Sequence, residues 1–174
     1  MSDTQSALVV IDIQNDYFDG FAFPLWQAET VLEKTLEAVE KARKIGLPVV
    51  LVRHVADPAN GPAPFFNDGT AGVAIRPELL AACPDAPVVT KRHADSFYQT
   101  DLSERLAEIG ATKILIAGMM TQNCVTHTAI SRQADIYNVT VLEDLSTSVS
   151  EMVHKIALNA LGPLVTVCSS TDVL

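Results

Sequence analysis

The chain has 174 residues, of which 48% are hydrophobic and 19% charged, and its formal net charge is −9. This length suits one domain that buries most of its surface in a single core, so we expect a single domain over residues 1–174. The acidic balance, with no Lys/Arg cluster longer than Lys91-Arg92, argues against nucleic acid or an anionic membrane as a partner.

The N-terminus and the cysteines indicate a compartment. The first residues carry no basic segment, and the apolar run after them is interrupted by Asp12, so we expect no signal peptide. No apolar stretch approaches the roughly 20 residues that span a bilayer. Cys83, Cys124 and Cys168 are odd in number and form no C-x-x-C pair, which indicates free thiols in a reduced cytoplasm.

Short β-rich apolar runs alternate with helical patterns along the chain. Residues 7–13 read as a strand buried on both faces. Residues 29–45 place Leu32, Leu36 and Val39 on one helical stripe. Capping-box patterns open two later helices, at Asp101 and at Ser148. The other expected elements are strands over 47–53, 86–90, 114–117, 139–142 and 164–167, and helices over 101–110, 124–134 and 148–162.

This alternation predicts an α/β fold, with a mostly parallel six-stranded sheet covered by helices on both faces. In such folds ligands bind beyond the carboxyl ends of the strands, near the point where the strand order reverses. Reactive residues at strand carboxyl ends are therefore the candidates for a functional site.

Three residues meet this condition: Asp12, Lys91 and Cys124. Taken singly, each has an ordinary structural interpretation: a carboxylate that caps a turn, a solvated lysine, and a thiol packed as a small hydrophobic group. Cys83 and Cys168 are expected to be packed thiols.

Together the three residues make chemical sense as a nucleophilic site. A helix N-terminus and a nearby ammonium would both favour the thiolate of Cys124. The Asp12 carboxylate could accept the thiol proton and return it to a leaving amine. Lys91 would keep Asp12 ionised and stabilise negative charge in an intermediate, and backbone N–H groups before the helix could form an oxyanion hole.

Three segments resemble the signatures of the isochorismatase-like cysteine hydrolases: VVIDIQNDYF (9–18), TKRHADSF (90–97) and AGMMTQNCVTHTA (117–129). That superfamily includes nicotinamidases, N-carbamoylsarcosine amidohydrolases and isochorismatases. The resemblance runs through almost the whole chain, and the three segments occur in the right order.

The resemblance implies a three-layer α/β/α, Rossmann-like fold with a catalytic triad of Asp12, Lys91 and Cys124. It further implies a cis peptide bond between Met119 and Met120, and an oxyanion hole made by the backbone N–H groups of Met120 and Cys124. The substrate would be a small molecule, and relatives are commonly homo-oligomers.

Other positions carry weaker expectations from the same resemblance. Gln14, Phe18 and Phe97 match positions that line or support the substrate pocket. The Asp-x-His metal motif of nicotinamidases is replaced here by Arg53-His54-Val-Ala-Asp57, so we predict no catalytic metal and no cofactor. His54 is expected to be a structural or surface residue.

Several alternatives stay open. The intact triad favours hydrolysis of a C–N bond in an amide or carbamoyl group. An isochorismatase-type vinyl ether hydrolase or a non-catalytic, thiol-sensing member of the fold remain alternatives. His127 could act as a base, although packing or solvent contact is favoured.

Two further segments have two interpretations each. The aromatic residues over 17–26 could wall a substrate pocket or bind a neighbouring subunit, and the second is preferred for Phe23 and Trp26. The loop over 57–69, which carries Phe65 and Phe66, could be a lid or a surface connection, and the lid is preferred.

Overall fold

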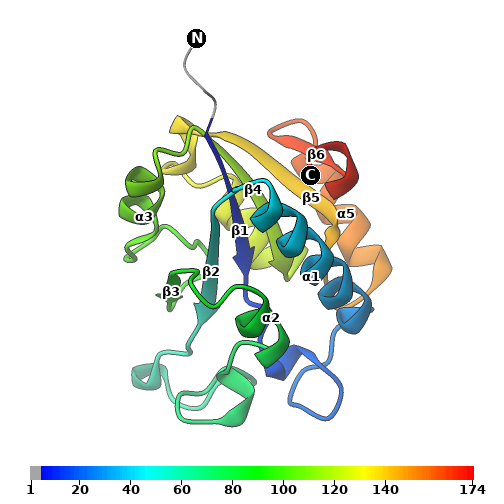
Figure 1. Cartoon of the computed structure of the whole chain (residues 1–174). Coiled ribbons are helices and arrows are strands. Elements are labelled where there is room, and N and C mark those ends of the chain that lie inside the picture. Colours follow the sequence, from blue (N-terminus) through cyan, green and yellow to red (C-terminus); the bar gives the residue numbers. More distant parts are fainter. Residues whose placement is uncertain (1–4) are drawn as a thin grey trace.

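Six strands, all parallel, form the centre of the structure in the order β3-β2-β1-β4-β5-β6 (Figure 1). The structure is a computed structural model that describes residues 5–174. Residues 1–4, on which part of the signal-peptide prediction rests, lie outside the described residues. The strands are β1 (Ser6–Ile11), β2 (Val49–His54), β3 (Val88–Lys91), β4 (Lys113–Met119), β5 (Asn138–Thr147) and β6 (Thr166–Cys168).

Helices cover both faces of the sheet, which explains why β1 is apolar at successive positions. Leu8 and Val10 pack with α1 and α2, whereas Ala7, Val9 and Ile11 pack into a second core with α3, α4 and the end of α5. The helices are α1 (Ala28–Lys44), α2 (Pro77–Ala82), α3 (Leu102–Ile109), α4 (Thr126–Ala129) and α5 (Glu151–Leu161). The predicted parallel sheet between two helical layers is confirmed.

The strand order reverses at β1. The chain goes outward from β1 through β2 to β3, and then returns to place β4 on the other side of β1. The carboxyl ends of β1 and β4 therefore flank the point where open α/β sheets bind ligands. Asp12 follows β1 directly, and Cys124 lies in the turn after β4.

Several predicted bounds differ from the observed ones by two or three residues, and two elements differ by more. The strand predicted over 139–142 is β5, which continues to Thr147 past the charged pair Glu143-Asp144. Its pairing with β4 shifts register between Ile116 and Gly118, so the strand resumes after an irregularity that the sequence pattern does not reveal. The helix predicted over 124–134 is also wrong, because a π-helical turn (Thr121–Val125) holds Cys124 and α4 ends at Ala129.

Neither predicted capping box forms. Asp101 makes no side-chain cap and instead pairs with Arg105 one turn along, at 3.0 Å. The cap of α5 is Ser150, whose hydroxyl accepts a hydrogen bond from the Val153 N–H. The hydroxyl of Ser148 donates to the side chain of Gln122 instead.

Two other expectations concern the burial of Cys83 and Cys168 and the presence of membrane-spanning helices. Cys83 is buried, as expected, but Cys168 is only partly buried, because it ends a short edge strand. Among residues 5–174, no helix has both the length and the apolar character needed to cross a membrane.

Candidate active site

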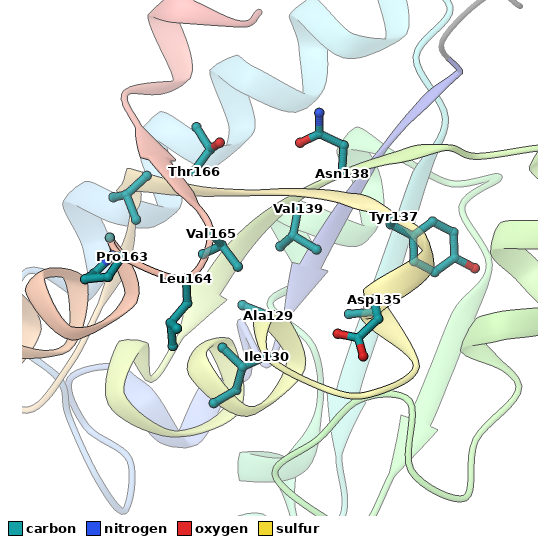
Figure 2. A pocket seen from close by; sticks show the side chains of 13 residues that line it. Ala129, Ile130, Asp135, Tyr137, Asn138, Val139, Pro163, Leu164, Val165 and Thr166 are labelled. Atoms are coloured by element: carbon teal, nitrogen blue, oxygen red, sulfur yellow. The ribbon is translucent and has the colours of Figure 1, made fainter.

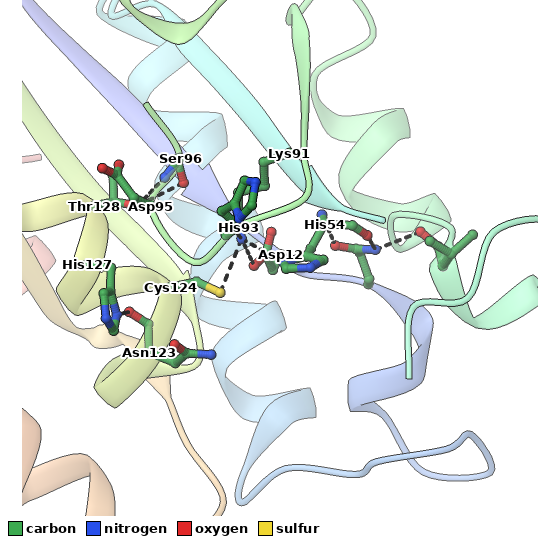
Figure 3. A network of polar contacts seen from close by, with 12 residues as sticks. Asp12, His54, Lys91, His93, Asp95, Ser96, Asn123, Cys124, His127 and Thr128 are labelled. Atoms are coloured by element: carbon green, nitrogen blue, oxygen red, sulfur yellow. Dashed lines mark hydrogen bonds and ion pairs between the residues drawn. The ribbon is translucent and has the colours of Figure 1, made fainter. Parts of the chain in front are cut away.

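The side chains of Asp12, Lys91 and Cys124 meet at the carboxyl edge of the sheet (Figure 3). Lys91 Nζ lies 2.9 Å from Asp12 Oδ2 and 3.1 Å from Cys124 Sγ. All three residues are at most 2% exposed. The three strand-end residues chosen from the sequence therefore form one buried cluster, in which a thiol, a carboxylate and an ammonium are in mutual reach.

Asp12 reaches the site from an unusual backbone conformation. Its φ is +54°, in the left-handed region, which is uncommon for residues other than glycine and occurs most often in Asn and Asp. Its N–H donates to the Val52 carbonyl, and its carbonyl accepts from the Gln14 N–H, both at 2.9 Å. Asp12 Oδ1 has no hydrogen-bond partner in the described structure, so this oxygen is free to receive a proton.

Gly118 allows β4 to approach β1 closely enough to bring the two strand ends together. Its φ is +123°, and a Cβ atom at this position would lie 2.0 Å from the carbonyl oxygen of Ile11. Only glycine fits such a contact. Since Ile11 and Gly118 immediately precede the segments that carry Asp12 and Cys124, this contact sets the spacing between carboxylate and thiol.

Cys124 is held in a π-helical turn rather than at the first turn of an α-helix. The Thr121 hydroxyl anchors this turn, because it donates to the Thr147 carbonyl at 3.0 Å and lies 2.8 Å from His154 Nδ1 on α5. The Thr126 hydroxyl donates to the Thr121 carbonyl. The peptide bond between Met119 and Met120, just before the turn, is cis.

Lys91 ends β3, and the loop after it is tied to α4. The Ser96 N–H donates to the Thr128 hydroxyl at 3.0 Å, and that hydroxyl donates to the Ser96 side chain. The Ser131 hydroxyl donates to Asp95 at 2.7 Å. These bonds fix the loop that follows the lysine to the helix that follows the cysteine (Figure 3).

The ionisation of the cluster differs from the sequence prediction. Burial raises the pKa of the Cys124 thiol, and the Asp12 carboxylate raises it further, whereas Lys91 lowers it by less. Burial lowers the pKa of Lys91, but Asp12 and Cys124 outweigh this and raise it overall. These directions favour a charged Lys91 and a protonated Cys124 thiol, so burial works against the thiolate that a helix N-terminus and a lysine were expected to favour.

His54 is a member of the cluster that the sequence interpretation missed. Its Nδ1 lies 3.0 Å from Lys91 Nζ. Burial and the Lys91 charge lower the pKa of His54 to about 4, so the ring is neutral near neutral pH. The available signal was its position at the carboxyl end of β2, beside Lys91 at the end of β3.

The residues around Lys91 do not suit a metal ion. One ligand atom each from Asp12, His54 and Cys124 lie within 4.8 Å of one another, a spacing that a metal could bridge. Lys91 Nζ, however, lies 2.9–3.1 Å from all three side chains and already supplies a cation there. A metal would have to displace this ammonium or share the space with it. The absence of a catalytic metal stays a prediction.

Gln14, Phe18 and Phe97 are all buried near or beneath the site. The Gln14 amide is fully engaged, because it bonds the backbone of His54 and the Val73 carbonyl. Phe18 carries the Arg76 guanidinium over its ring at 4.5 Å, and the Phe97 ring stacks on Tyr137. These contacts explain the burial of the three side chains, and a role in lining or supporting the substrate pocket stays a prediction.

An aromatic cluster closes the site on the side of the loop over 57–69. Phe66 is buried between Tyr17, with ring centroids 4.6 Å apart, and His54, at 5.9 Å. Phe23 packs on Phe65 at 4.9 Å, and Trp26 lies beside His154. Phe23 and Trp26 are only partly buried by these contacts, and their proposed place in a subunit interface stays a prediction.

Tyr17 is a second residue that the sequence interpretation did not single out for the site. Its phenol is almost completely buried, and its pKa is raised by burial and then by the charges of Asp12 and Cys124. Its ring packs on Phe66, which in turn lies beside His54. The dense aromatic composition of residues 17–26 was the signal, but composition alone did not separate a pocket wall from an interface.

The comparisons with known proteins identify the family of the chain. A family model described as the isochorismatase domain matches residues 6–173. The chain belongs to the isochorismatase family. It is 34% identical over 139 residues to the isochorismatase family protein YddQ of Bacillus subtilis, covering 80% of this chain and 76% of YddQ.

A curated hydrolase and a solved structure are also similar to this chain. A streptothricin hydrolase of Streptomyces noursei is 30% identical over 71% of this chain and 46% of its own length. The crystal structure of an isochorismatase-like hydrolase from Alkaliphilus metalliredigens superposes with a TM-score of 0.86, at 27% identity, covering 97% of this chain and 96% of that one. The resemblance in the three sequence segments therefore identified the family correctly.

A hollow also lies at the opposite edge of the sheet, but its residues do not suit a reactive site. This hollow of about 930 Å³ is formed where β5 and β6 begin, beside the end of α4 (Figure 2). Asp135 and Tyr137 are the ionisable residues of its lining. It contains no nucleophile with an adjacent base, which is what covalent catalysis requires.

Proposed function

We propose that this protein is a cysteine hydrolase that cleaves a C–N bond in a small amide or carbamoyl compound. The observation that carries the proposal is the contact of one buried ammonium, Lys91 Nζ, with Asp12 Oδ2 at 2.9 Å and Cys124 Sγ at 3.1 Å. A nucleophile and a proton acceptor held together by a fixed positive charge suit acyl transfer through a covalent intermediate.

The first half of the reaction forms a thioester. Cys124 Sγ attacks the carbonyl carbon while its proton passes to Asp12 Oδ1, the oxygen that is not in the ion pair with Lys91. The carbonyl oxygen becomes an oxyanion. When the oxyanion collapses, the C–N bond breaks, Asp12 returns the proton to the nitrogen, and ammonia or an amine leaves.

The second half regenerates the thiol. Water gives a proton to Asp12 as its oxygen attacks the thioester carbon, and the C–S bond then breaks. The departing sulfur takes the proton back from Asp12, and a carboxylic or carbamic acid leaves. Lys91 remains an ammonium throughout, which its raised pKa favours. Its charge offsets negative charge first on Asp12 and then on sulfur and the oxyanion.

The oxyanion would be bound by the backbone N–H groups of Met120 and Cys124. Met120 precedes the π-helical turn with extended backbone (φ −91°, ψ 145°), and Cys124 lies within that turn. Donors fixed by the main chain need no rearrangement as charge develops, which is the main advantage of an oxyanion hole. The anchoring of the turn by Thr121 and Thr126 supports this role.

Two features favour a small substrate. Cys124 is 2% exposed, so the reacting carbon must enter a narrow space beside a buried thiol. The aromatic cluster of Tyr17, Phe65 and Phe66 occupies one side of that space. A compact amide or carbamoyl compound can reach the sulfur, whereas a folded polypeptide cannot.

The test is hydrolysis of a panel of small amides and carbamoyl compounds, and of isochorismate, by the wild-type protein and by Cys124→Ala and Cys124→Ser. We expect C–N cleavage in the wild type, a covalent acyl adduct on Cys124 visible by mass spectrometry, and loss of both in Cys124→Ala. Full amide hydrolysis by Cys124→Ala would overturn the mechanism. Turnover of isochorismate that survives Cys124→Ser would instead support ether hydrolysis.

A further inference from the structure

The Lys91 ammonium has three N–H groups, and their surroundings identify an additional residue of the site. Asp12 Oδ2, His54 Nδ1 and Cys124 Sγ lie 2.9, 3.0 and 3.1 Å from Nζ. Three partners placed along the N–H directions of an ammonium would lie about 5 Å from one another. One ligand atom from each of these residues lies within 4.8 Å of the other two, so the three side chains are grouped around the ammonium. The His93 carbonyl, also at 3.0 Å, is a fourth acceptor.

The backbone of His54 is fixed in both directions by one buried side chain. Gln14 Nε2 donates to the His54 carbonyl at 2.8 Å, and the His54 N–H donates to Gln14 Oε1 at 2.7 Å. The strand register places His54 directly beside Lys91, and the ring rests near Phe66. The imidazole is therefore positioned by its surroundings, so its contact with Lys91 is not an incidental one.

We propose that His54 is a positioning residue for the reaction, whose neutral Nδ1 accepts a hydrogen bond from Lys91 and thereby aims the other N–H groups of the ammonium at Asp12 and Cys124. The inference rests on the proposed function for its effect on turnover, but its effect on Lys91 is independent of any substrate. An ammonium can donate to His54 only if Nδ1 carries no proton, so the proton of the neutral ring is on Nε2.

The two states of the reaction explain why a third acceptor is useful. At rest the thiol is neutral and is a weak acceptor, so Asp12, His54 and the His93 carbonyl hold the ammonium. As the proton moves from Cys124 to Asp12, negative charge moves to sulfur, which Nζ already contacts. With His54 holding one N–H throughout, Lys91 need not rotate during this transfer, and the site stays preorganised.

His54→Leu and His54→Asn separate this role from packing. Leucine fills similar space but accepts no hydrogen bond, whereas the Asn side-chain oxygen can occupy the place of Nδ1. Loss of a charge-assisted hydrogen bond predicts a fall in kcat of about 10- to 100-fold in His54→Leu, with little change in KM. His54→Asn should recover most of this loss.

The titration of Lys91 is the direct readout, measured by ¹⁵N NMR of its side-chain ammonium in the protein without substrate. An acceptor that bonds the charged form raises a lysine pKa, so in His54→Leu the ammonium should deprotonate at lower pH than in the wild type. His54→Asn should titrate as the wild type does. His127→Leu is the matched control, because this exposed histidine bonds the Asn123 carbonyl and should leave Lys91 unchanged.

The outcomes are distinguishable. If the Lys91 ammonium deprotonates at lower pH in His54→Leu and at the wild-type pH in His54→Asn, the inference is supported even if no amide substrate is found. An unchanged Lys91 titration with unchanged kcat overturns it while leaving the role of Cys124 intact. Equal losses in both variants, matched by a lower free energy of unfolding, would show a purely structural role and also overturn it. Should His54→Leu fail to fold, His54→Gln, which keeps polarity but carries its acceptor too far out, takes its place.

Discussion

Replacing Lys91 by methionine tests whether the centre of the site is a buried ion pair. The side chains of Lys91 and Asp12 are both 0% exposed and are 2.9 Å apart. Methionine keeps most of the volume but removes the charge, so the Asp12 carboxylate would be buried without a partner. Breaking a buried pair in this way costs about 3–5 kcal/mol, a large part of the roughly 5–15 kcal/mol that stabilises an ordinary domain.

The stability lost in Lys91→Met should depend on pH in a definite direction. Without Lys91, burial penalises the charged form of Asp12, so the folded variant should keep a proton at pH values above about 3.9, where an unfolded Asp loses it. The folded state would then bind more protons than the unfolded state, so stability falls as pH rises through this range. The deficit of Lys91→Met should therefore be largest near about pH 7 and shrink towards about pH 4, as folding in the protonated form becomes less costly.

Guanidinium unfolding at several pH values measures the effect. The double variant Asp12→Asn/Lys91→Met removes both charges and should recover most of the lost stability while remaining inactive. Lys155→Met is the matched control, because its pair with Glu151 is 70% and 56% exposed and should contribute less than about 1 kcal/mol. Wild-type stability of Lys91→Met near about pH 7, with an unchanged denaturant slope, would refute the buried ion pair.

Two other predictions concern packing and assembly. Gly118→Ala should lower the free energy of unfolding by more than about 3 kcal/mol in thermal or chemical unfolding, because its Cβ would overlap a β1 carbonyl oxygen. Gly20→Ala, also at positive φ but with open space around it, should lose only about 1 kcal/mol, and equal losses would contradict the close-contact argument. We also propose, from the resemblance, a homo-oligomer that includes the exposed apolar residues Met152, Ile156 and Leu164. Light scattering should then show a wild-type oligomer that Ile156→Glu dissociates, and a wild-type monomer would reject the proposal.

The sequence predicted most of the sheet because its strands are short, apolar and separated by clear helical patterns. It also predicted which residues meet, since parallel strands bring their carboxyl ends to one edge. It could not predict that β5 continues past Glu143-Asp144, because the irregular pairing with β4 depends on tertiary contacts. The sequence also did not predict that α4 ends at Ala129. Just beyond this end the Ser131 hydroxyl bonds Asp95, which lies 36 positions away in the chain.

In the site, too, the sequence predicted the reactive residue types but not the contacts that depend on the tertiary structure. Asp12, Lys91 and Cys124 were identifiable because carboxylate, ammonium and thiol are reactive types at strand ends. His54 was interpreted as a structural or surface residue because the nicotinamidase metal motif is missing. Its contact with Lys91 depends on the pairing register of β2 with β3, which the spacing of residues in the sequence does not give. Its partner is Lys91 rather than a metal, so the missing metal motif did not mean that His54 lies outside the site.

The protonation of Cys124 changes how reactivity should be sought in such a site. Searches for catalytic cysteines favour a lowered pKa, but burial and Asp12 raise that of Cys124. A raised pKa is compatible with catalysis when the base is already in place and the charge that stabilises the anion is fixed, because the thiolate then forms only as the carbonyl is attacked. The free protein should accordingly react slowly with iodoacetamide near neutral pH, and slow alkylation is therefore no sign of an inert thiol. What distinguishes Cys124 from the other buried thiol, Cys83, is its set of partners: Cys83 donates to a backbone carbonyl, whereas Cys124 contacts an ammonium beside a free carboxylate oxygen.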